Sequence, residues 1–131
     1  MKPVTDIITL YDIKLLVDTF YTKVQHDTLL APIFNNRIKD NWDEHLEKMY
    51  RFWQTVLLDE HTYFGSPFHP HASMHLEQSH FSIWIKLFTE TVDELFTGHK
   101  AVEAKWRAEK MAEMFQIKLE HLRKSSATNI F

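Results

Sequence analysis

The amino-acid sequence predicts an all-α protein. Apolar residues recur at steps of three and four along most of the chain, which is the spacing of one face of an α-helix. The 131 residues include only two glycines and four prolines, so these periodic stretches are seldom interrupted. No segment shows the alternation of apolar and polar residues that is typical of strands. We therefore expect helices joined by short connections.

Length and composition predict one domain over residues 1–131, because 44% hydrophobic residues and ten Phe supply a single core. Eighteen acidic residues against fifteen Lys and Arg give a net charge of -3 without a long basic cluster, so we expect no nucleic-acid partner. Cysteine is absent, which excludes disulfides, Cys-ligated zinc and thiol catalysis. No apolar run is long enough to span a bilayer, and we expect a cytoplasmic protein without membrane insertion.

Two helices are expected in the first half of the chain. The first has a stripe made of Ile13, Leu16, Val17, Phe20 and Val24, with Tyr21 at its edge. Residues 32–36 contain Pro32 and two Asn, and we expect a turn-like break there. Asn41 with Glu44 resembles a capping box that opens the second helix. The apolar face of that helix comprises Trp42, His45, Leu46, Met49, Phe52, Trp53 and Val56.

The second half begins with an irregular connection over residues 59–75, where Gly65, Pro67 and Pro70 interrupt the pattern and where His71 lies. A third helix follows, with the face Phe81, Trp84, Ile85, Phe88, Val92, Leu95 and Phe96. Gly98 separates it from a last helix, with the face Val102, Trp106, Met111, Met114, Phe115, Leu119 and Leu122. We expect residues 125–131 to form a frayed tail.

The distribution of four residues suggests haem chemistry. Tyr21, His45 and Trp84 lie in aromatic-rich helical stretches, whereas His71 lies in the broken one. This is the distribution expected when one imidazole reaches a haem iron from one side while polar side chains face it from the other. In this distribution the chain resembles a haem-binding globin.

A set of short motifs carries a more specific resemblance. They are Phe20-Tyr21, Ile33-Phe34-Asn35, His45, Phe52-Trp53, Gly65-x-Pro67-Phe68, His71, His80-Phe81-x-x-Trp84, Phe88 and Thr91-Val92-Asp93-Glu94-Leu95-Phe96. In their order and spacing, over roughly residues 10–122, the chain resembles the third group of the truncated haemoglobins. The resemblance implies a shortened globin fold, a two-over-two helical sandwich around haem, in which the helix of the proximal histidine is reduced to a loop or turn.

The resemblance also implies roles for individual residues. His71 would be the proximal metal ligand, although His69 and His75 are near neighbours and the Leu-Pro pair that usually follows this histidine in the family is missing. Tyr21 and Trp84 would donate hydrogen bonds to the ligand on the distal side. His45 would either contact the ligand or gate the pocket. The remaining expected contacts are Phe34, Trp53, Phe68 and Phe88 around the haem, and Lys48 and Arg51 as partners of its propionates.

The implied cofactor is haem b, and the implied function is reversible binding of oxygen, carbon monoxide and nitric oxide. Hydrogen-bond donors in the pocket would slow the release of oxygen, which favours sensing, scavenging or redox chemistry over bulk delivery. Nitric oxide dioxygenation or a peroxidase-like reaction would need a separate reductase, because the chain holds no reductase domain. We expect a monomer or a weak homodimer.

Two other classes of protein remain open at this stage. His69-x-His71-x-x-x-His75-x-x-x-x-His80 could make a non-haem metal-binding helical protein. Zinc sites within one irregular stretch usually include Cys or a carboxylate, however, and a site there leaves Tyr21, His45 and Trp84 unexplained. A cofactor-free helical interaction module would use the aromatic residues as ordinary core.

Overall fold

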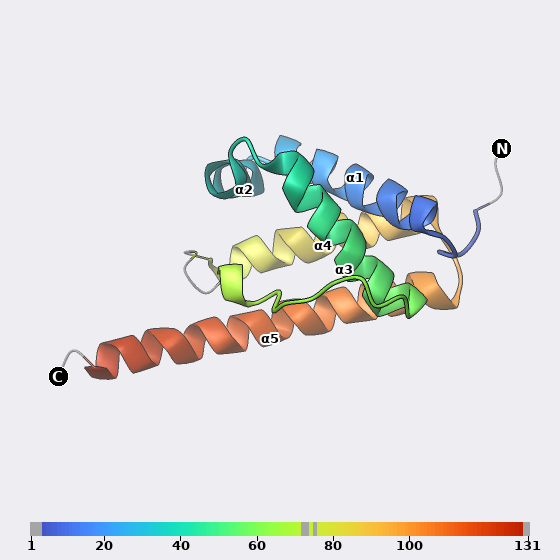
Figure 1. Ribbon diagram of the computed structural model, residues 1–131. Helices are drawn as coiled ribbons and strands as arrows, with labels where there is room; N and C mark the ends of the chain where they lie inside the picture. Colours follow the sequence, from blue (N-terminus) through green and yellow to red (C-terminus); the bar gives the residue numbers. More distant parts are fainter. Residues whose placement is uncertain (1–3, 72–73, 75, 130–131) are drawn as a thin grey trace.

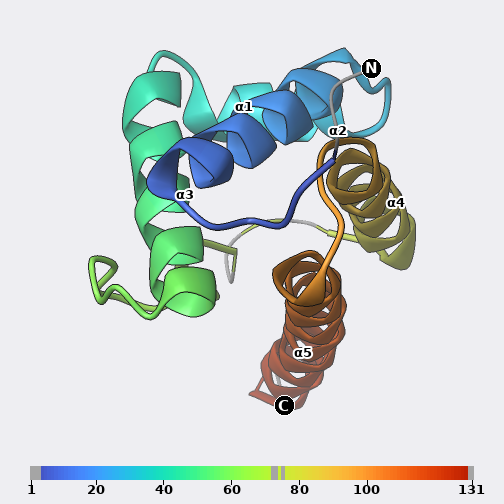
Figure 2. The ribbon, with the colours of Figure 1, turned by 90° about the vertical axis from the view of Figure 1, so that its right-hand side faces the viewer.

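The computed structural model describes residues 4–71, 74 and 76–129 and confirms the all-α class. Its elements, in chain order, are α1 (Leu10–His26), α2 (Leu30–Ile38), α3 (Trp42–Leu58), the single 3-10 turn η1 (His69–His71), α4 (Gln78–Leu95) and α5 (His99–Asn129) (Figure 1). Helix α1 packs across α3, and α4 packs beside α5 (Figure 2), so the two pairs form the layers of a two-over-two sandwich. Within the described ranges, no helix has both the length and the apolar composition of a membrane span.

Helix α1 matches its sequence pattern closely. Thr9 caps it, because its hydroxyl accepts a hydrogen bond from the Asp12 amide while the Asp12 carboxylate accepts one from the Thr9 amide. All five residues of the expected stripe are buried. Tyr21, expected at the edge, is also buried, with 6% of its surface exposed. The helix therefore turns Tyr21 toward the interior.

The expected break at residues 32–36 is wrong, because this segment lies inside α2. Pro32 occupies the first turn, where a missing backbone N–H costs no helical hydrogen bond. The Asp27 carboxylate accepts hydrogen bonds from the Leu29 and Leu30 amides, both at 2.9 Å, and so satisfies the start of the helix from outside it. The capping box at α3 is also wrong: α3 begins after Asn41, but the Asn41 side chain makes no capping hydrogen bond.

Helix α5 differs from the expected pattern in which side chains it buries. Val102, Trp106 and Met114 are 62%, 52% and 51% exposed. Phe115 and Leu119 are buried as expected, but the rest of the buried stripe is made of alanines, namely Ala101, Ala104, Ala108 and Ala112. Alanine lets α5 approach the neighbouring helices closely, whereas a search for bulky residues selects the opposite face. The helix also continues through residues 125–129, where we expected a frayed tail.

The start of α5 is held by the beginning of the chain. The Asp6 carboxylate accepts hydrogen bonds from the Lys100 amide at 3.0 Å and the Ala101 amide at 2.9 Å, two of the amides that a helix leaves without an internal partner. Gly98 precedes them with a φ of 129°, and a Cβ there would lie 2.6 Å from the Asp6 side chain. An isolated bridge between Thr5 and Phe96 continues the contact.

We predict that Asp6→Ala lowers the free energy of unfolding by about 1–2 kcal/mol at neutral pH, the value of a helix cap. Burial opposes the charge of Asp6, but hydrogen bonds from the Lys100, Ile7 and Ala101 amides outweigh it and hold the pKa below its usual 3.8. The stabilisation by Asp6 is therefore complete above about pH 3.8, the usual pKa of the group, and is lost as the pH falls through the lower pKa of the folded state. Urea unfolding across this range measures it.

The control is Asp40→Ala, at an exposed carboxylate that has no hydrogen bond or ion pair with any described residue. Its unfolding free energy should stay within about 0.5 kcal/mol of the parent at every pH. An Asp6→Ala variant as stable as this control at neutral pH would contradict the capping role.

Candidate functional site

A cavity of about 330 Å³ lies between the helices, far larger than the space of a single water molecule. All five α-helices and the segment around η1 contribute to its wall. Its lining residues include Tyr21, Leu30, Phe34, Arg37, Ile38, His45, Lys48, Met49, Phe52, Trp53, Tyr63, His71, Met74, Phe81, Trp84, Met111 and Phe115. Most of these side chains are apolar or aromatic, so the few polar ones mark where chemistry can occur.

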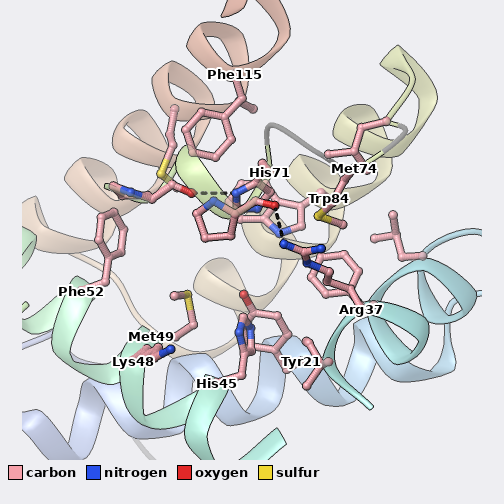
Figure 3. Close-up of a pocket in the computed structure, with 18 of the residues that line it drawn as sticks. Tyr21, Arg37, His45, Lys48, Met49, Phe52, His71, Met74, Trp84 and Phe115 are labelled. Carbon is pink, nitrogen blue, oxygen red and sulfur yellow. Dashed lines mark hydrogen bonds between the residues drawn. The ribbon is translucent and has the colours of Figure 1, made fainter. Parts of the chain in front are cut away.

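On one side of the cavity, His71 projects from η1 (Figure 3). Its Nδ1 lies 2.7 Å from the Pro67 carbonyl oxygen, which can only accept, so Nδ1 carries the proton and Nε2 keeps its lone pair. The ring rests against Phe115 of α5, with ring centres 4.8 Å apart. Burial lowers the pKa of His71 against the opposing effect of the Pro67 hydrogen bond, and the nearby Arg37 charge lowers it further. The imidazole is thus held neutral, the form that ligates a metal.

Tyr21 and His45 face the cavity from the side opposite His71 (Figure 3), with perpendicular rings whose centres are 5.0 Å apart. The Nε2 of His45 is buried and has no hydrogen-bond partner among the described residues. Burial, with a smaller effect from the nearby Lys48 charge, lowers the pKa of His45 to about 4, so it is neutral at pH 7. Burial also raises the pKa of Tyr21, so its hydroxyl stays protonated. Neither the Tyr21 hydroxyl nor the Trp84 indole N–H has a hydrogen-bond partner among the described residues.

The Trp84 ring is positioned by a stack of aromatic side chains. It lies parallel to Phe88, with ring centres 5.6 Å apart, and Phe88 in turn stacks on Trp53 at 5.0 Å. Phe88 is 1% exposed and is not part of the cavity lining, so it supports the wall from behind. Phe68 also lies outside the lining, and its ring packs against Phe115 instead. Of the four expected haem contacts, the structure brings Phe34 and Trp53 to the cavity.

The basic residues near the cavity also differ from expectation. Lys48 lies on its rim, 3.5 Å from the Glu44 carboxylate. Arg51 is turned away from the cavity and binds Glu47 at 2.9 Å and Gln54 at 3.0 Å. The sequence pattern missed Arg37, which lines the cavity and donates a hydrogen bond to the Pro70 carbonyl. Its position in the last turn of a helix gives no hint of this contact, because the acceptor is a distant backbone atom.

The four-histidine arrangement falls partly outside the described residues, since His75 and the His69 side chain are not among them. His80 lines the cavity, but its Nδ1 already accepts a hydrogen bond from the Glu77 amide at 2.8 Å. Within the described part of the chain, no group of three or more histidine, aspartate or glutamate side chains could hold a metal ion.

The sequence was compared with known protein families, and residues 7–119 match the bacterial-like globins. The chain belongs to this family. Over 105 residues the globin is 37% identical to the group 3 truncated haemoglobin of Campylobacter jejuni, covering 77% of this chain and 83% of that protein. A crystal structure of group III truncated haemoglobin from the same organism superposes with a TM-score of 0.82 at 35% identity, covering 89% of this chain and 95% of the other. This globin is therefore a haem-binding protein of the third group of truncated haemoglobins.

The residues of the cavity fit a haem. His71 offers a neutral imidazole with an available Nε2, and the wall around it is largely aromatic and aliphatic. The buried, unpartnered Nε2 of His45 lies across the cavity, where a small ligand could meet it. Lys48 at the rim supplies a cation for an acidic group of the cofactor. A fixed imidazole, apolar walls and opposed polar groups are together what a globin pocket requires.

We predict that Tyr21→Phe leaves the free energy of unfolding unchanged within about 0.5 kcal/mol, or raises it, because the hydroxyl contributes no hydrogen bond to the fold. The matched control is Tyr50→Phe, since the Tyr50 hydroxyl donates to the Asp18 carboxylate. Losing that bond should cost about 0.5–1.5 kcal/mol. Urea unfolding of the reduced, haem-loaded proteins without added gas measures both. Equal losses in the two variants would give Tyr21 a structural role.

Proposed function

We propose that this globin holds haem b through Nε2 of His71 and binds oxygen, carbon monoxide and nitric oxide reversibly on the side facing Tyr21, His45 and Trp84. When bound, the haem supplies an iron centre that takes up one diatomic molecule at a time. One observation carries the proposal. An imidazole with a fixed tautomer lies across the cavity from polar groups that have no hydrogen-bond partner among the described residues. Lys48 is the rim cation we assign to a propionate, in place of the pair Lys48 and Arg51.

The distal residues would act as hydrogen-bond donors to the ligand. The raised pKa of Tyr21 keeps its hydroxyl protonated, and an indole N–H can only donate. A hydrogen bond to an atom that carries negative charge contributes about 1.5–3 kcal/mol. The donors should therefore retain oxygen, the more easily polarised ligand, more strongly than carbon monoxide. Because His45 packs edge-on against both Tyr21 and Trp42, we propose that it also limits the movement of the Tyr21 ring.

Strong retention of oxygen favours sensing, scavenging or redox chemistry over bulk delivery. Nitric oxide dioxygenation is the redox reaction we favour, and a peroxidase-like reaction is the second candidate. In the first, nitric oxide, oxygen and one electron give nitrate, so a separate reductase must supply one electron per turnover. We also propose that the globin is a monomer or a weak homodimer.

We predict that Tyr21→Phe and Trp84→Phe each increase the rate of oxygen dissociation by about tenfold or more, the value of one hydrogen bond to a charged acceptor. Stopped-flow displacement of oxygen by carbon monoxide measures these rates. Tyr50→Phe should leave the rate unchanged, since its hydroxyl is bound to Asp18. Unchanged rates in both pocket variants would remove these side chains from ligand binding.

We predict that His71→Gly abolishes the proximal signature in the absorption spectrum of the ferrous carbon monoxide complex, and that added imidazole restores it. The reason is that no other described histidine is expected to take its place: His80 also lines the cavity, but its Nδ1 accepts a hydrogen bond from the Glu77 amide, which puts the proton of the neutral ring on Nε2. His80→Ala is therefore the control and should keep the parent spectrum. If the His71→Gly spectrum also matched the parent, another residue would have to be the ligand.

A further inference from the structure

Most hydrogen bonds of the turn that carries His71 are made within the turn. The Pro67 carbonyl accepts a hydrogen bond from Nδ1 of His71, and the Phe68 carbonyl accepts one from the His71 amide at 2.8 Å. The His71 carbonyl accepts one from the Met74 amide at 3.0 Å. These bonds fix the shape of the turn but do not fix its position relative to the helices. Packing on Phe115 locates it from the side of α5.

One hydrogen bond ties this turn to another helix. Nη2 of Arg37 donates to the Pro70 carbonyl oxygen at 3.1 Å, across 33 residues of sequence (Figure 3). No other side chain of a helix hydrogen-bonds to the described residues 67–71 and 74. The ring of Pro70 fixes φ at that residue, so one of the two backbone rotations next to this carbonyl is restricted. Arg37 therefore donates its hydrogen bond to a conformationally restricted residue of the turn, next to His71.

The anchor of Arg37 lies in the opposite wall of the cavity. Arg37 belongs to the last turn of α2, the helix that also contributes Leu30 and Phe34 to the lining. The Phe34 ring lies 6.0 Å from that of Tyr21, centre to centre. Arg37 thus spans from the helix beside Tyr21 to the turn that carries His71. A shift of α2 would therefore be transmitted to the turn through this hydrogen bond.

We propose that Arg37 is a positioning residue for His71, acting through the Pro70 carbonyl. By holding the turn between α2 and Phe115, Arg37 sets the direction in which Nε2 of His71 points into the cavity. This inference rests on the proposed role of His71 as the haem ligand. The alternative, in which Arg37 serves as a second rim cation for a propionate, predicts a different experimental result.

The test uses haem-loaded protein with Arg37→Met, which removes both the donor and the charge, and Arg37→Lys, which keeps both. Arg107→Met on α5 is the matched control, because Arg107 is an arginine outside the cavity lining that pairs with Glu103. Resonance Raman spectra of the ferrous, gas-free proteins report the iron–histidine stretching band. Transfer of haem to an excess of a colourless acceptor protein reports the rate of haem loss.

We expect Arg37→Met to shift and broaden the iron–histidine band and to raise the rate of haem loss about two- to tenfold, the value of one hydrogen bond. Arg37→Lys should return the band toward its parent position, and Arg107→Met should change neither measurement. If Arg37→Met takes up too little haem, Arg37→Gln is measured in its place, with the same expectation.

An unchanged band in the Arg37 variants overturns the inference. If haem loss rises while the band stays unchanged, Arg37 acts on the cofactor rim instead of on the turn. The proposed function fails separately if the parent protein shows no iron–histidine band or if the band survives in His71→Gly, and the inference about Arg37 then fails with it.

Discussion

An imidazole can offer a lone pair to iron only if its other nitrogen keeps the proton, and the Pro67 carbonyl imposes this condition on His71. The constraint is demanding because His71 lies on a short 3-10 turn instead of a long helix. The protein compensates with rigid neighbours: two prolines supply acceptor carbonyls, and Phe115 supports the ring from α5. The side of the cavity that carries His71 is thus held by backbone carbonyls and by the contact with Phe115.

The side of the cavity that carries Tyr21 and His45 follows the opposite principle, since the polar ends of these side chains have no hydrogen-bond partner in the part of the chain that the structure describes. A buried polar atom without a hydrogen bond lowers the stability of a protein by about 1–3 kcal/mol, so Nε2 of His45 destabilises the fold unless a ligand pairs with it. Burial keeps both Tyr21 and His45 uncharged. The stack of Trp84 on Phe88 limits the rotation of the indole. These polar groups are held in place by packing and can form hydrogen bonds to a ligand that binds reversibly.

The sequence predicts those parts of the structure that depend on residue type at helical spacing, such as the buried face of α1 and the place of His71 in a broken stretch. The prediction from the sequence is wrong where a general rule has an exception. Pro32 lies in the first turn of α2 and does not end the helix, and Ala104 of α5 is buried although the prediction selected bulky residues. The helical spacing also predicts that Phe88 points toward the interior, but it does not show that Phe88 lies behind the residues that line the cavity. Arg37 leaves no pattern at all, because its acceptor is a backbone oxygen.

The Asp6 cap joins residues 94 positions apart, and this separation bears on how the protein folds. The Asp6 carboxylate can make these hydrogen bonds only after α5 has formed, because the amides of Lys100 and Ala101 belong to the first turn of that helix. Contacts between distant residues close slowly, so this one should form late. Phe115 lies on the same helix, behind His71. Stable capture of the cofactor is therefore expected only after α5 has left the ribosome and packed behind His71.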